Sequence, residues 1–125
     1  MTRLPALFLL AALSLAACAD EGPVSGPGTL TATLVSPNGP EGAALVELVG
    51  ENIGAITALG DTEVFSESDG GSTQVVLVNQ SGGALSFWVA VADTTAPPSA
   101  VVHQVSGPDD QLRATLDGYA LEFGR

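Results

Sequence analysis

The sequence predicts an all-β fold, a single antiparallel β-sandwich over residues 29–125. Apolar and polar residues alternate along several short runs, as in strands that turn one face towards a core. Turn residues separate these runs at intervals of about 8 to 12 residues, and the chain has 15 glycines and 8 prolines to supply them. No stretch of about ten residues or more has the periodicity of an amphipathic helix. A small closed barrel is the alternative, because alternation alone does not separate these two architectures.

The predicted strands follow one another from Thr29 onward. We expect about eight of them, at residues 29–36, 43–50, 55–60, 62–68, 73–80, 84–93, 100–107 and 119–123. The first run alternates with leucine and alanine on one face and stops at the turn sequence PNGPEG. The run over 62–68 ends at Asp-Gly-Gly, which is a strong hairpin signal.

Residues 84–93, ALSFWVAVAD, are the clearest strand. A period of two places four apolar side chains on one face: Leu85, Phe87, Val89 and Val91. Trp88 falls on the opposite face among small residues. If the first face lies in the core, Trp88 stands on an outer face, available to stack on a sugar ring or on a side chain of a protein partner. Burial of Trp88 under a loop or in a second apolar layer is the alternative.

Composition narrows the function classes. The chain of 125 residues has room for one domain. It carries 14 acidic residues against three arginines and no lysine, for a formal charge of −11. This charge repels phosphate backbones and anionic lipid surfaces, so nucleic acid is excluded as a partner. Hydrophobic residues nevertheless make up 46% of the chain, so we expect it to fold.

The N-terminus has the pattern of an export signal. Arg3 precedes an apolar run over residues 4–13, whose length of about ten residues lies within the range of signal peptides. A membrane-spanning helix needs about 20 apolar residues, and Pro5 and Ser14 interrupt any longer reading.

The end of this signal, LAAC at Leu15–Cys18, resembles the lipobox of bacterial lipoproteins. In that family the cysteine is acylated, the signal is removed before it, and stable membrane anchoring comes from two or more acyl chains. The resemblance implies a signal peptide at residues 1–17 and lipidation with palmitate-type chains at Cys18. The following residues, ADEGPVSGPG, are acidic, rich in glycine and proline and without periodicity, so we expect a flexible tether over 18–28 before the domain over 29–125. The lipobox also implies attachment to membrane lipid at the bacterial cell envelope, in the outer membrane or on the periplasmic or cell-surface face of a membrane.

Two other interpretations of Cys18 stay open. Ala17–Ala19 also fits the pattern for ordinary signal cleavage before Asp20, which would release a soluble secreted β-domain. Alternatively, Cys18 is an ordinary apolar residue of the signal.

The run of sequences TLTATLVSPN, GAALVELVG, STQVVLVNQSGGALSFWVAV and PSAVVHQV resembles the cohesin-type sandwich over residues 29–105. Gly83, Leu85, Phe87 and Val89 carry the core part of this resemblance. Related sandwiches include carbohydrate-binding modules, so the resemblance implies adhesion or binding of a protein or glycan.

The residues offer little chemistry for catalysis. His103 is the only histidine, lacks a nucleophile motif near it, and is expected to share a strand face with Val101 and Val105. Three carboxylates lie on or beside one predicted strand, at Glu63, Glu67 and Asp69. Paired carboxylates could act as the acid and base of a small hydrolase, but a solvated acidic edge strand is the simpler explanation. We therefore expect that the protein is not an enzyme and has no cofactor or metal site. The functional residues that we expect are Cys18 as the lipidation site and Trp88 as part of a binding surface.

Overall fold

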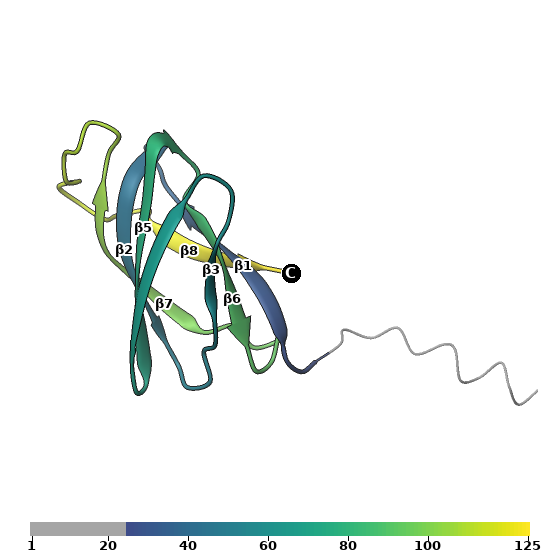
Figure 1. Ribbon diagram of the computed structural model, residues 1–125. Helices are drawn as coiled ribbons and strands as arrows, with labels where there is room; N and C mark the ends of the chain where they lie inside the picture. The colour runs from purple at the N-terminus through teal and green to yellow at the C-terminus, as the bar shows by residue number, and fades with distance from the viewer. Residues whose placement is uncertain (1–24) are drawn as a thin grey trace, which may run out of the picture.

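The computed structural model describes residues 25–125, which form a two-layered β-sandwich (Figure 1). Its strands are β1 (Gly28–Val35), β2 (Glu41–Val49), β3 (Ile56–Ala58), β4 (Glu63–Asp69), β5 (Ser72–Gly83), β6 (Ser86–Val91), β7 (Ser99–Ser106) and β8 (Ala120–Gly124). The predicted fold class is confirmed, and every predicted strand corresponds to an observed one. The predicted signal peptide, Cys18 and residues 19–24 of the predicted tether lie outside the described residues.

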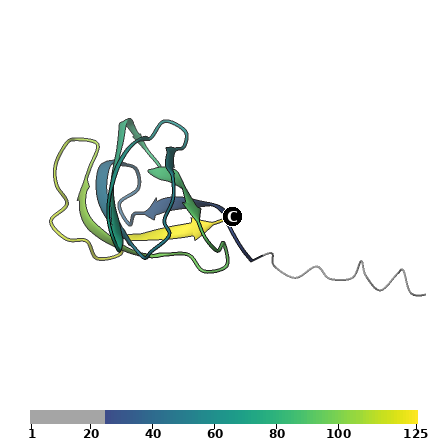
Figure 2. The same ribbon diagram turned by 60° about the horizontal axis from the view of Figure 1, so that its bottom comes forward.

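Each sheet has four antiparallel strands, in the orders β3-β6-β1-β8 and β4-β5-β2-β7. From β1 to β8 the chain changes sheet at every connection except one, because β4 and β5 are the only consecutive strands of this part that share a sheet. Their hairpin turns at Gly70, whose φ of 65° favours glycine. The two views place β8, from the end of the chain, beside β1 from its start (Figures 1 and 2).

The core lies between the two sheets and is built by the alternation seen in the sequence. Its buried apolar residues are Leu30, Ala32, Leu34, Ala44, Val46, Leu48, Val75, Leu77, Leu85, Phe87, Val89, Val91 and Val105. Phe87 is the largest side chain among those that are completely buried. Burial of this apolar surface is the main force that holds the two sheets together.

The two ends of the sandwich differ in what they contain. The chain enters at one end, where Gly28 pairs with Val91; we call this the tether end. Gly26 is already attached to the fold there, because its N–H donates to Asp93 Oδ1 at 3.3 Å and its carbonyl accepts from Thr94 N at 3.0 Å. The chain thus joins the fold within the segment that the sequence assigns to the tether.

The opposite end, which we call the far end, carries the turn over 36–40 and the long loop over 107–119. Gly42 brings this loop close to β2, because a Cβ at position 42 would lie only 2.7 Å from the carbonyl oxygen of Gly107. A glycine is needed for that approach of backbone to backbone. Among the described residues, no helix is long and apolar enough to cross a membrane.

Candidate functional site

The outer face of the β4-β5-β2-β7 sheet carries a row of apolar side chains. The register places Phe65 of β4 opposite Val76 of β5, and Val76 opposite Leu45 of β2. The next residues along β2 and β5, Ala44 and Leu77, are buried in the core. The alternation that fills the core therefore also builds a second apolar row on the outside.

We call Phe65, Val76, Leu45 and Leu112 the apolar patch. Phe65 is 60% exposed, Val76 39% and Leu112 65%. A shallow hollow of about 290 Å³ lies between Leu45, Val76 and Leu112, and another of about 210 Å³ lies between Phe65 and Val76. Val76 thus lies between two hollows that are open to solvent. These hollows could receive side chains of a protein partner.

Leu112 reaches this face because the far-end loop runs back beside β7. Leu112 forms an antiparallel bridge with Ser106, the last residue of that strand. The N–H of Arg113 donates to the carbonyl of Val105 at 2.8 Å, and the N–H of Gly107 donates to the carbonyl of Gln111 at 2.9 Å. These bonds fix the loop against the edge of the sheet.

A buried carboxylate, Glu41, holds the other side of the same loop. Glu41 is only 1% exposed, and its Oε1 accepts from Arg113 Nη2 at 2.7 Å and from Arg113 Nε at 3.0 Å. Its Oε2 accepts from Ser36 Oγ at 2.7 Å and from the Tyr119 hydroxyl. Asn38 Nδ2 donates in turn to the Tyr119 hydroxyl at 2.7 Å. We call these five residues the Glu41 cluster.

The surroundings of Glu41 lower the pKa of its carboxyl group. Burial by itself raises the pKa of the carboxyl, but the hydrogen bonds from Arg113, Tyr119 and Ser36 together outweigh it and lower the pKa below the usual 4.5. The same ion pair raises the pKa of Arg113, chiefly through its hydrogen bond to Glu41. Glu41 and Arg113 are therefore both charged, and the hydrogen bonds of the Glu41 carboxylate are made within the cluster.

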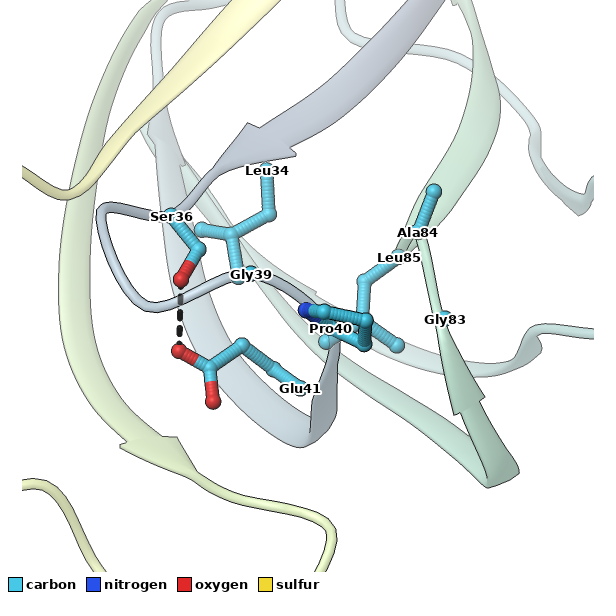
Figure 3. A pocket seen from close by; sticks show the side chains of 8 residues that line it. All are labelled: Leu34, Ser36, Gly39, Pro40, Glu41, Gly83, Ala84 and Leu85. Atoms are coloured by element: carbon cyan, nitrogen blue, oxygen red, sulfur yellow. Dashed lines mark hydrogen bonds between the residues drawn. The ribbon is translucent and has the colours of Figure 1, made fainter.

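Glu41 also borders a hollow of about 300 Å³ that is lined by Leu34, Pro40 and Leu85. Figure 3 shows the Glu41 and Ser36 side chains pointing towards each other beside this hollow. Among the described residues, no buried side-chain polar atom lacks a hydrogen-bond partner. The hollow consequently offers a ligand no unpaired buried group, and we assign the Glu41 cluster a structural role.

Acidic side chains of β4 border the apolar patch. Glu63 and Glu67 flank Phe65 on the outer face of β4, and both are exposed. Glu67 and Asp69 line a wide hollow of about 420 Å³ near the hairpin. No group of three or more potential metal ligands occurs within residues 25–125. The carboxylates of β4 lie along a solvated edge strand, where charge also discourages pairing with another chain.

His103 is exposed beside Glu47, as Val101 is, but its predicted grouping with Val105 is wrong. Strand alternation groups it with Val101 and Val105, but Val105 is 1% exposed and lies in the core whereas Val101 is 45% exposed. The reason is a β-bulge in β7, which shifts the register against β2 between Leu45 and Val46. His103 Nε2 lies 2.8 Å from Glu47 Oε1, and this hydrogen bond is the main cause that lowers the pKa of Glu47.

Trp88 lies on the outer face of the other sheet, 40% exposed. Its strand neighbours Phe87 and Val89 are completely buried. Thr31 of β1 and Thr57 of β3 stand opposite it on either side. The other predicted functional residue, Cys18, lies outside the described residues.

The apolar patch and the Glu41 cluster are not evident in the sequence. Phe65, Val76 and Leu112 come from three separate segments, and Glu41 and Arg113 are 72 residues apart. The available signal for the patch was the position of Phe65 between two glutamates on an alternating strand. Comparisons of the chain with protein families, with curated proteins and with solved structures found no match.

Proposed function

We propose that this chain is a lipid-anchored, non-catalytic binding module of the bacterial cell envelope, and that it docks a protein partner on the apolar patch. The observation that carries this proposal is the exposure of Phe65, Val76 and Leu112 on one sheet face. The inward side chains of the same strands already fill the core. The outer row therefore adds exposed apolar surface that the sandwich does not require for its own packing.

Contiguous exposed apolar surface with a polar border is typical of sites where proteins associate. Here the border is acidic, with Glu63 and Glu67 beside Phe65 and with Glu47 further along the same face. The protein as a whole is also strongly negative, with a formal charge of −11. These charges favour a partner that presents an apolar centre surrounded by lysine and arginine, and they would speed its approach at low salt.

A comparison of patch variants tests this docking. The wild-type domain, Phe65→Ala and Val101→Ala serve as immobilised baits for solubilised envelope proteins, and the retained species is identified, purified and titrated by calorimetry. Val101 is the matched control, because it is an exposed valine on the same sheet outside the patch. We expect wild type and Val101→Ala to bind alike, and Phe65→Ala to bind at least about tenfold more weakly, as expected for loss of an aromatic contact at an interface.

Raising the salt concentration should weaken the wild-type complex, because the acidic border contributes to it. Equal binding by wild type and Phe65→Ala would refute docking of a basic partner on the patch. The same conclusion would follow if the immobilised domain retained only further copies of its own chain.

The anchor is supported by the lipobox at Leu15–Cys18 and by the geometry of the chain entry. Cys18 precedes Gly26, the first residue seen attached to the fold, by eight residues. Even fully extended, such a segment spans only about 25 to 30 Å. An acylated Cys18 would hold the tether end towards the lipid and leave both sheet faces and the far end accessible.

Intact mass measurement of the mature protein tests the anchor. We expect the wild-type chain to begin at Cys18 and to carry a diacylglyceryl group, with or without a further acyl chain on its amino group. Cys18→Ser should lack the lipid and leave the membrane fraction. An unmodified wild-type chain that begins at Asp20 would contradict the anchor and would indicate a secreted domain, while leaving docking on the apolar patch testable in solution.

A further inference from the structure

The outer face of β3, β6 and β1 is uncharged, in a chain whose formal charge is −11. Its outward residues pair across the strands as Thr29 with Ala90, Thr31 with Trp88 and Thr33 with Ser86, while Thr57 of β3 stands opposite Trp88. On the neighbouring edge strand β8, Glu122 stands directly opposite Thr33. The outward residues of β3, β6 and β1 thus carry no charge, and a single carboxylate of β8 stands at the border of the face.

Trp88 lies at the centre of the uncharged face. The side chains directly opposite on the neighbouring strands, Thr31 and Thr57, are within contact distance of a large aromatic group. Both neighbours carry a hydroxyl and a methyl group, so they offer hydrogen-bonding atoms without screening the indole behind a long charged chain. An aromatic surface with a threonine on each side suits a ligand that has both an apolar face and a rim of hydroxyls.

The hydroxyls of this face keep hydrogen-bonding capacity in the fold. Thr31 Oγ1 donates to the carbonyl of Gly124 at 3.2 Å, and Ser86 Oγ donates to Thr33 Oγ1 at 3.3 Å. A hydroxyl that donates once still has lone pairs that accept. Thr31 and Ser86 can therefore accept hydrogen bonds from a hydroxylated ligand without breaking these contacts.

We propose that this face binds an uncharged hexopyranose polymer, with a sugar ring stacked on Trp88 and its hydroxyls directed to Thr31 and Thr57. A pyranose ring has the required apolar face and hydroxyl rim. The absence of charge on the face gives an ionic polymer no partner to pair with, and the net negative charge of the protein disfavours an acidic glycan. The acidic border that would attract a basic protein lies on the opposite sheet, around the apolar patch.

The two outer faces belong to different sheets and point in opposite directions. The module can therefore hold a glycan and a protein at the same time, as an adaptor between them. The glycan site does not depend on the apolar patch or on the lipid anchor, and its test uses separate variants.

Tryptophan fluorescence tests this site directly, because Trp88 is the only tryptophan of the chain. Titration with cellohexaose, chitohexaose and laminarihexaose, each uncharged, should shift the emission of Trp88 and reach saturation for at least one of them. An acidic oligogalacturonate at the same concentrations should leave the emission unchanged. Absence of a shift with all three neutral sugars, or a shift that follows protein concentration alone and so reports self-association, would overturn the proposal.

Sedimentation with the insoluble form of the polymer that binds provides the second readout. Trp88→Ala should lose binding at least tenfold, Trp88→Tyr should retain part of it, and Val101→Ala on the opposite sheet should bind like wild type. Thermal unfolding of each variant shows whether it is folded. A folded Trp88→Ala that still binds like wild type would refute the site, as would equal losses in Trp88→Ala and Val101→Ala.

Discussion

Replacement of Phe87 by alanine is expected to lower the free energy of unfolding by about 3 to 5 kcal/mol, the usual cost of removing a buried phenylalanine. Phe87 is completely buried and is the largest such side chain among the described residues. The loss combines the transfer of its ring from water with the cavity that the rigid sheets leave behind. Domains of this size have only about 5 to 15 kcal/mol of stability, so Phe87→Ala removes a large part of it.

The next residue in the chain supplies the matched control. Trp88 is larger than Phe87, yet it is 40% exposed on the outer face. We expect Trp88→Ala to cost less than about 1.5 kcal/mol, in the range of ordinary surface substitutions with some lost packing. Urea denaturation of both variants, followed by circular dichroism, measures the difference. Similar losses in the two variants would show that Trp88 is part of the packed core.

Replacement of Arg113 by alanine is expected to destabilise the fold by about 3 kcal/mol, because it leaves the buried carboxylate of Glu41 without its cation. Arg113 donates both of the hydrogen bonds that Glu41 Oε1 accepts. Its loss should also release the far-end loop, so exchange of the amide protons of residues 107–119 should become faster. Arg125→Ala, at the exposed end of β8, is the control and should change the stability by less than about 0.5 kcal/mol.

The pH dependence of stability follows from the same cluster. The pKa of Glu41 is lower in the folded chain than its usual 4.5, so the unfolded chain binds the proton more readily. The stabilisation by Glu41 is therefore complete above about pH 4.5 and is lost as the pH falls through the folded pKa. Urea unfolding between about pH 7 and pH 3 should show this loss, and Glu41→Gln should have lower stability at neutral pH with a smaller dependence on acid. An equally steep loss in Glu41→Gln would assign the effect to other carboxylates.

The strands and the core were predictable because the signal for each is local. The side chains of a strand alternate with a period of two, so residues 84–91 alone place Phe87 and Trp88 on opposite faces of the strand. Turn residues such as Gly70 mark where a strand must end, because their backbone conformation is unfavourable for other residues. For these features the neighbouring residues contain all the necessary information.

His103 shows where a local signal fails. Its predicted grouping with Val105 assumes an uninterrupted strand, but the extra residue of a β-bulge reverses the alternation beyond it. The bulge is decided by how β7 pairs with β2, which no window of β7 sequence contains.

The sequence by itself determined the all-β class, the eight strands and the separation of Phe87 and Trp88 onto opposite strand faces, since each follows from alternation and turn chemistry over a few residues. Only the tertiary structure decided that Phe65, Val76 and Leu112 meet on one face and that Glu41 pairs with Arg113. These groupings depend on which strands are neighbours and in what register. That order is set by the packing of the whole chain around one core, which no short segment specifies.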